Sequence, residues 1–268
     1  MRVLRLITFA ILSAVVAAGS AYFLVVRPRV RGWGVDPADN ELDIPGDDLV
    51  PDATGVETRG VIIGAKPDDI WPWLIQMGYG RAGWYSYDAL DMKGSSAERI
   101  LPEFQAIAPG EVMPTHPGGG FLVKVVEPGR ALVLYSDTEL VRAQQAAAQA
   151  AGIGDEMPTP GLKATDAALS ASFPEFAASW AFYLQPIADE ETRLVERFRI
   201  RTPGSGPAKA VLGEVMGTGI VLMSRKQLLG IKARVEGTIH GTPPAEPDSV
   251  LEVLDLSERE PAPEAAQP

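Results

Sequence analysis

The sequence predicts an α+β domain in which a curved antiparallel sheet wraps around one long C-terminal helix. Strand-like stretches separated by short Gly- and Pro-containing turns predict the sheet. These stretches lie at 111–115, 121–126, 131–136, 179–186 and 192–201. Residues 207–236 predict the helix, because their apolar side chains recur at helical spacing and form a wide apolar face.

One further strand and one helix precede this meander. Residues 58–65 form the first predicted strand, with Val61 and Ile63 on the same face. Pro67 is suited to the first turn of a helix, where its missing N–H has no partner to lose. Pro72 would lie inside that helix, so the helix either bends there or begins about one turn later. Short helical turns are expected further along, at 87–92 and 97–104.

The rest of the chain divides by composition. Residues 32–57 are rich in Gly, Pro and Asp and are interpreted as an extended linker that lies against the domain at 58–237. Residues 138–171 interrupt the strand pattern with an Ala- and Gln-rich insertion of high helix propensity. Residues 238–268 are rich in Pro, Ala and Glu and predict a disordered acidic tail.

Composition excludes several classes of function. The 268 residues include 24 Lys and Arg against 35 Asp and Glu, a formal net charge of −11. That charge argues against nucleic-acid binding, which requires basic patches to neutralise phosphates. With no Cys and two His, the chain cannot form disulfides, Cys-ligated zinc or a His-rich metal site. We therefore predict neither a metal nor a cofactor.

The N-terminal residues predict a membrane anchor. Residues 6–26 carry no charge, are mostly apolar and are about as long as a bilayer-spanning helix requires. Arg2 and Arg5 precede them, and three Arg follow within residues 27–31. A cleaved signal peptide is the alternative, although the apolar run is long for one and ends at those Arg. The nearly even distribution of Arg leaves the orientation almost undecided, with a slight preference for a cytoplasmic domain.

The predicted order of elements is that of the helix-grip fold. Residues 58–91 resemble the opening of the SRPBCC superfamily, which includes the START, Bet v 1-like and polyketide cyclase-like proteins. The specific part is a strand ending in Ala65-x-Pro67, followed by Trp71 and then Leu74. Residues 221–236 resemble the terminal helix of that superfamily. The resemblance implies a hydrophobic cavity between sheet and helix that binds lipids, sterols or polyketides, but it carries over no catalytic residue, since the superfamily shares none.

Glu196 is the most informative candidate site residue. Alternation along 192–201 places it on the same face as Leu194 and Phe198, where a carboxylate is costly unless paired or hydrated. It could be a polar group in a ligand cavity, with a raised pKa suited to acid–base chemistry. The alternative is a salt bridge to an Arg or an exposed strand end.

A second candidate is a cluster of aromatic and charged residues: Arg81, Trp84, Tyr85, Tyr87 and Asp88. Aromatic side chains with polar tips can orient a ligand in a mostly apolar pocket. In a catalytic role, Asp88 or Tyr85 would donate a proton and Arg81 would bind an anion. The alternative is a rigid surface loop with core aromatics.

The two histidines are weaker candidates. His116 could act as an acid or base near neutral pH, but it precedes a Pro-Gly-Gly-Gly turn where an exposed residue is expected. His240 lies in the predicted tail. The Gly run lacks the Lys-Ser/Thr of a phosphate loop.

Three functions are compatible with these features. The favoured one is membrane-anchored binding of a small hydrophobic ligand, a lipid or polyketide-like molecule, between sheet and helix. A cyclase or dehydratase acting on a hydrophobic substrate is the second. The third is a pocketless module that binds another protein through the acidic tail and the insertion.

Overall fold

A computed structural model describes residues 32–91, 94–153, 175–204 and 207–237. These residues form an α+β fold with a six-stranded antiparallel sheet in the order β1-β6-β5-β4-β3-β2. The strands are β1 (Gly55–Ile63), β2 (Val112–His116), β3 (Gly119–Glu127), β4 (Ala131–Asp137), β5 (Ala177–Ala188) and β6 (Glu191–Arg201). Every sequential pair from β2 to β6 is adjacent, and β1 joins the sheet through β6. This arrangement fits the helix-grip fold that the sequence predicts.

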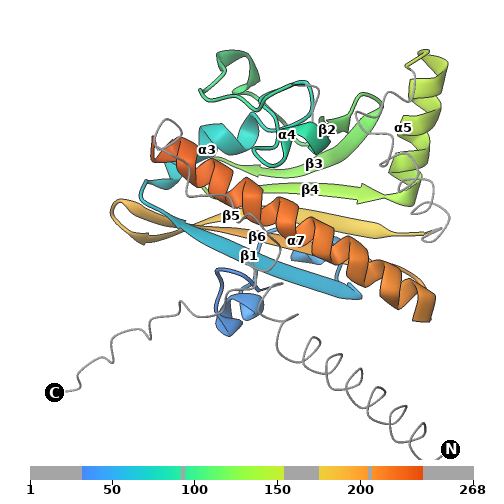
Figure 1. Ribbon diagram of the computed structural model, residues 1–268, viewed down its shortest axis with the longest axis horizontal. Coiled ribbons are helices and arrows are strands. Elements are labelled where there is room, and N and C mark those ends of the chain that lie inside the picture. Colours follow the sequence, from blue (N-terminus) through green and yellow to red (C-terminus); the bar gives the residue numbers. More distant parts are fainter. Residues whose placement is uncertain (1–31, 92–93, 154–174, 205–206, 238–268) are drawn as a thin grey trace, which may run out of the picture. The chain divides into compact units, whose positions relative to one another are not determined.

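One long helix runs along the sheet, as Figure 1 shows. It is α7 (Pro207–Val235), and its C-terminal part packs near α3 (Pro67–Ile75) and β1. The helix α3 begins at Pro67 and contains Pro72, so the alternative of a start one turn later is wrong. We call the face of the sheet that packs against α3 and α7 the inner face.

The shorter elements correct several predicted boundaries. The strand β1 begins at Gly55 rather than at residue 58, and the expected turns shrink to α4 (Asp88–Asp91) and a 3-10 turn, η4 (Pro102–Phe104). Residues 97–101 are not helical, because Pro102 disfavours a helical conformation of the residue before it. Local propensity alone did not reveal where these helices would end.

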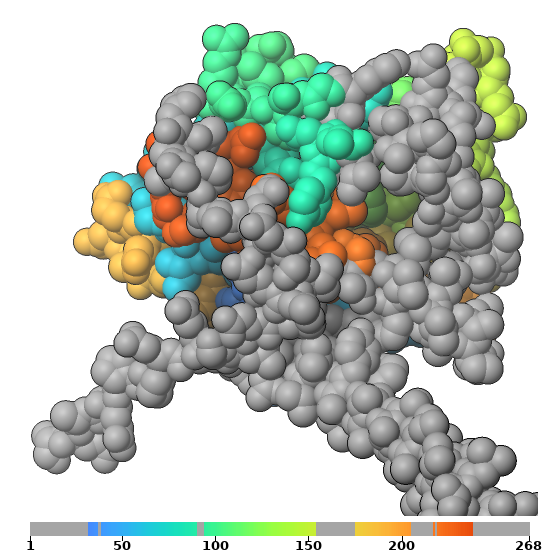
Figure 2. Space-filling model, viewed as in Figure 1, coloured from blue at the N-terminus to red at the C-terminus, as the bar shows by residue number. Residues whose placement is uncertain are grey.

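The predicted insertion begins with a helix, α5 (Thr138–Ala150). The Asp137 side chain caps it by accepting a hydrogen bond from the Leu140 N–H at 2.7 Å. Gln144 fastens the helix to the β2–β3 hairpin through two hydrogen bonds with the Gly120 backbone, at 3.0 and 3.1 Å. No residue of α5 is buried, and the helix forms a yellow-green edge of the surface in Figure 2.

Other predicted segments lie outside the described residues. They include the anchor at 6–26, the remainder of the insertion from 154 to 171, and the tail at 238–268 with His240. Within the described ranges, no helix is both long and apolar enough to cross a bilayer.

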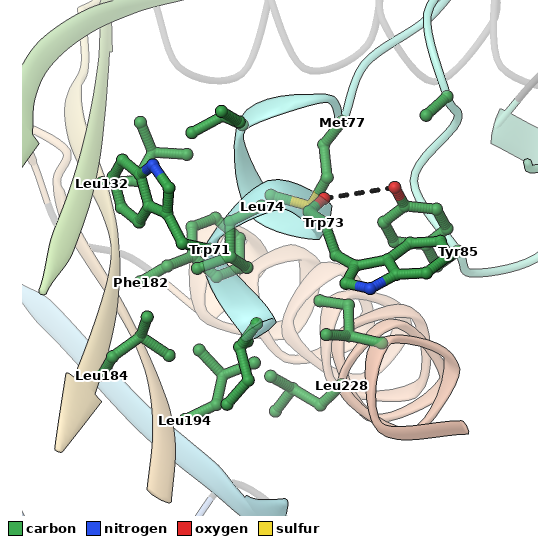
Figure 3. Close-up of a cluster of buried hydrophobic side chains, with 14 of the residues drawn as sticks. Trp71, Trp73, Leu74, Met77, Tyr85, Leu132, Phe182, Leu184, Leu194 and Leu228 are labelled. Atoms are coloured by element: carbon green, nitrogen blue, oxygen red, sulfur yellow. Dashed lines mark hydrogen bonds between the residues drawn. The ribbon is translucent and has the colours of Figure 1, made fainter. Parts of the chain in front are cut away.

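The main hydrophobic core lies between the inner face, α3 and the C-terminal part of α7. Figure 3 shows Trp71 and Leu74 of α3 in one cluster with Phe182, Leu184 and Leu194 of the sheet, whereas Trp73 points toward Tyr85, whose ring it meets edge-on at 6.0 Å. Leu228 of α7 closes the same cluster. Val61 and Ile63 contribute from β1, as the predicted alternation requires. Burial of these large side chains is the main force holding α7 to the sheet.

The opposite, outer face carries a second, smaller core. Residues 32–54, which we call the N-terminal strap, include the 3-10 turns η2 (Pro37–Glu41) and η3 (Asp47–Leu49). Ile44 of the strap packs against Val133, Ala181 and Val195 of the outer face. The segment predicted as a linker therefore covers the side of the sheet that α7 leaves free.

Candidate functional site

A buried ion pair joins β1 and β6 on the inner face. Arg59 and Glu196 are direct cross-strand partners, and their side chains are 0% and 1% exposed. Arg59 Nη1 lies 3.9 Å from Glu196 Oε2, close enough for Coulomb attraction but too far for a hydrogen bond. Arg59 Nη2 also donates to the Glu57 carboxylate on the same strand.

The other oxygen of Glu196 connects three elements. Glu196 Oε1 accepts from Trp180 Nε1 of β5 at 2.7 Å and from Ser224 Oγ of α7 at 2.8 Å. Arg59 Nη1 also reaches Ser224 Oγ at 3.5 Å. The carboxylate is therefore held in place by both the sheet and the helix.

Two buried polar atoms of this pair have no hydrogen-bond partner among the described residues. They are Glu196 Oε2, an acceptor when the carboxyl is ionised, and Arg59 Nε, a donor. A buried polar group left without a partner costs about 1–3 kcal/mol, and more when it is charged. Such atoms are usually satisfied by an ordered water or by a ligand.

Burial also changes the acidity of Glu196. Loss of solvation raises the pKa of this carboxyl above its ordinary value of 4.5. The neighbouring Arg59 and the hydrogen bonds from Ser224 and Trp180 act in the opposite direction but only partly offset burial. Glu196 thus has a carboxyl whose proton affinity is increased, as acid–base chemistry requires.

Aromatic side chains gather around Trp180. Its ring stacks on Trp84 with centroids 5.2 Å apart and planes 16° apart, and it meets the Phe121 ring edge-on at 5.5 Å. Phe182 lies on another side at 5.1 Å. Trp180 and Phe121 are only partly buried. The Glu196 carboxyl therefore adjoins an aromatic surface that is buried at Trp84 and Phe182 and partly exposed at Trp180 and Phe121.

The contacts of Tyr85 are those of a residue that holds its loop in place. Its hydroxyl donates to the Trp73 carbonyl at 3.1 Å, as Figure 3 shows, and accepts from Gln76 Nε2 at 2.8 Å. Burial raises the pKa of this phenol. The backbone is left-handed, with φ of 58°, and its carbonyl lies against α7, where a Cβ on Gly230 would come within 2.2 Å. Tyr85 thus fixes the loop to the helix.

Arg81 and Asp88 are likewise engaged within their loops. Arg81 donates to the carbonyls of Ile75 and Met77 at 2.9 and 3.0 Å, at the end of α3. Burial lowers the pKa of its guanidinium. Asp88 accepts from the Ser96 N–H and hydroxyl at 2.9 and 2.5 Å. These bonds account for both side chains without an anion or a substrate.

The structure joins Tyr85 and Asp88 of the predicted cluster through Ser96, whose hydroxyl accepts from the Tyr85 N–H at 3.1 Å and donates to Asp88. Only Trp84 reaches the surroundings of Glu196, through its stack on Trp180. Tyr87 is 37% exposed and lies beneath the Lys226 ammonium at 5.8 Å. His116 ends β2, half-buried rather than exposed, and its Nδ1 accepts from the Gly118 N–H at 3.1 Å. Among the described residues, no group of three or more acidic or His side chains is arranged to hold a metal ion.

Three members of the site were not predicted. Arg59 lies two residues before Val61, so extending the β1 alternation backward would have placed it on the inner face. Trp180 lies in the predicted strand 179–186, but nothing in the sequence shows which residue it contacts. Ser224 precedes the buried Leu228 by one helical turn and thus shares its face of α7.

No protein-family model and no curated protein matches the chain. Solved structures give weak likenesses. A protein from Arthrobacter aurescens matches with 12% identity and a TM-score of 0.37, covering 76% of this chain and 92% of its own. A hypothetical protein from Helicobacter pylori has 11% identity and a TM-score of 0.38, covering 72% and 94%. A norcoclaurine synthase point mutant from Thalictrum flavum has 10% identity and a TM-score of 0.26, covering 64% and 93%. Scores this low support neither a family nor a function.

Proposed function

We propose that this chain is a member of the SRPBCC superfamily and binds a small, mostly apolar ligand between the inner face and α7. The observation that carries the proposal is the Glu196–Arg59 pair. Both side chains are buried, yet each keeps one polar atom that has no partner among the residues the structure describes. The aromatic surface around Trp180 adjoins this pair.

This combination is typical of small-molecule sites. Such sites are lined mainly by apolar and aromatic side chains, with a few fixed polar groups that orient the ligand. Trp84, Phe121 and Trp180 supply the apolar contacts, and Glu196 with Arg59 supplies the polar ones. Gln185 Oε1 and Arg193 Nε also lack partners among the described residues, but the orphan atoms of Glu196 and Arg59 belong to two paired side chains beside the aromatic rings around Trp180.

Titration with N-phenyl-1-naphthylamine, an uncharged fluorophore, tests the proposal on the full chain. We expect saturable binding with energy transfer from tryptophan, and Trp180→Phe should reduce that transfer. Trp33→Phe is the matched control, because Trp33 lies under Arg225 of α7 at the margin of the main core, outside the ring stack of Trp84 and Trp180. A signal that rises linearly without saturation, identical in all three proteins, would contradict a ligand site.

The raised pKa of Glu196 favours a second candidate, an acid–base enzyme of the dehydratase or cyclase type. Mass spectrometry of a hydroxylated ligand recovered from the protein separates the two functions. An unchanged ligand supports binding alone. Loss of one water from the ligand, abolished by Glu196→Gln, supports dehydration.

We also propose that residues 6–26 attach this domain to a membrane, with the domain on the cytoplasmic side. The uncharged apolar run between flanking Arg supports this. Alkaline extraction of membranes should leave the full chain in the pellet and release a chain that starts at residue 32. Protease digestion of intact spheroplasts would contradict the cytoplasmic placement if it degraded the domain.

A further inference from the structure

We infer that the ligand carries a hydroxyl group, which Glu196 and Arg59 bind together. This inference rests on the proposed function and names the chemistry of the ligand's polar end. It follows from the character of the two atoms that lack partners, Glu196 Oε2 and Arg59 Nε.

The remaining polar atoms of the pair are already engaged. Glu196 Oε1 accepts two hydrogen bonds, from Trp180 and Ser224. Arg59 Nη2 donates to Glu57, and Nη1 donates to Ser224. These contacts hold both side chains from β1, β5 and α7. One acceptor and one donor are thus left over, on groups that are fixed before a ligand arrives.

A hydroxyl matches this pair of atoms better than other common groups. It can donate to Oε2 and accept from Nε, because an O–H is both donor and acceptor. A ketone can only accept, an ammonium group can only donate, and an alkane can do neither. A hydroxyl also fits either protonation state of Glu196, since Oε2 accepts when ionised and can donate when protonated.

The surroundings determine the rest of the ligand. Trp180 joins the polar pair to the aromatic surface, because its indole N–H binds Glu196 while its ring contacts Trp84 and Phe121. A ligand whose hydroxyl meets Glu196 would therefore lay a hydrocarbon or aromatic body against these rings. The ligand class is an amphipathic alcohol with a single polar end.

Three probes with the same carbon skeleton test the inference on the full chain: decan-2-ol, decan-2-one and decane. Isothermal titration calorimetry should give the tightest binding for the alcohol and the weakest for the alkane. We expect about a tenfold or greater difference between them, the effect of leaving a buried polar group without a partner. The advantage of the alcohol over the ketone should increase with pH, because ionised Glu196 cannot donate to a carbonyl.

Two variants distinguish recognition of the hydroxyl group from a general loss of folding or binding. Glu196→Gln keeps an oxygen for Trp180 and Ser224 and places an amide N–H₂ near the position of Oε2, so it should reduce the preference for alcohol over ketone. It should also make that preference independent of pH, because an amide does not titrate as the Glu196 carboxyl does, while Glu57 and Arg59, the other charged groups facing the site, are unchanged. Glu191→Gln, at the exposed start of β6, is the matched control and should behave as the wild type.

The outcomes distinguish the two proposals. Saturable binding of alcohol, ketone and alkane with equal affinity would overturn the hydroxyl inference and leave the proposed ligand site standing, with water as the partner of Oε2. If none of the three probes binds saturably, the proposed function and this inference both fail. An alcohol preference that Glu196→Gln leaves unchanged would also overturn the inference.

Discussion

Two adjacent residues of β6 point to opposite faces of the sheet, and they differ in how completely their polar side-chain atoms are hydrogen-bonded. Glu196 points to the inner face and Arg197 to the outer face, and both are at least 98% buried. On the outer face, Arg197 Nε donates to Thr58, Nη1 to the Leu42 carbonyl and the Asp47 carboxylate, and Nη2 to the Asp39 carbonyl, at 2.5–3.2 Å. Every nitrogen of that guanidinium has a partner.

The inner pair differs in that its polar atoms are only partly satisfied. Glu196 Oε2 and Arg59 Nε have no hydrogen-bond partner within the described part of the chain, although their residues are as deeply buried as Arg197. Burial of a charge is tolerated when hydrogen bonds replace its hydration. The comparison teaches that burial alone does not mark a functional residue. Burial combined with an unused, rigidly held polar atom is the more informative sign.

The largest effect is expected from removing the hydrogen-bond network that Arg197 forms on the outer face. Arg197→Met should reduce the free energy of unfolding by about 3–5 kcal/mol, because it removes the guanidinium's hydrogen bonds to the Asp47 carboxylate and to the Asp39 and Leu42 carbonyls. Urea denaturation followed by circular dichroism measures the change. Arg201→Met is the control, since Arg201 and its partner Asp52 are largely exposed, and it should have little effect. Equal losses in the two variants would remove the distinction between satisfied and exposed arginines.

A somewhat smaller effect is expected where the strap meets the sheet. Gly46 has φ of 94°, and a Cβ there would lie 2.4 Å from Val133 Cγ1. Gly46→Ala should therefore destabilise the domain by about 2–3 kcal/mol through backbone strain and overpacking. Gly80→Ala isolates the strain alone, since Gly80 also has positive φ but no atom within 4 Å. If thermal unfolding shows the same loss for both variants, the strap does not pack as tightly as described.

The smallest effect concerns the inner pair and depends on pH. Because the folded protein raises the pKa of Glu196, it retains a proton that the unfolded chain has released. The free energy of unfolding of the wild type should therefore decrease as pH rises from about the ordinary value of 4.5 through the folded-state pKa. Each pH unit by which the folded-state pKa exceeds the unfolded value lowers the free energy of unfolding at high pH by about 1.4 kcal/mol.

Glu196→Gln should lose this component of the pH dependence and gain stability relative to the wild type as pH rises. Paired chemical denaturation curves across the pH range give the measurement. A difference between the two proteins that stays constant with pH would mean that the inner carboxyl titrates as if it were exposed.

The inner face was largely predictable from the sequence, because periodicity carries the information. Alternation in β6 placed Glu196 with Leu194, and helical spacing predicted α7. The partner of Glu196 was not predictable, since Arg59 is distant in sequence and meets it only through the β1–β6 register. A single sequence does not specify which strands pair or in what register.

The outer face was the least predictable part of the fold. The strap has a linker-like composition, and its stability comes from contacts with β6 that no local pattern reveals. Arg193 binds Asp39 at 2.9 Å, and Arg197 binds Asp47 at 2.5 Å. Likewise, the charges of Arg81 and Asp88 suggested a site, but the carbonyls and the serine that they bind are set by loop geometry.

A crystal structure of the full chain with decan-2-ol would show whether the inner pair, and not the outer network, is a ligand site. We expect the alcohol oxygen within hydrogen-bond distance of Glu196 Oε2, with the carbon chain against Trp180 and with the Arg197 contacts unchanged. A structure in which water alone contacts Oε2 and the alcohol binds elsewhere would contradict that expectation.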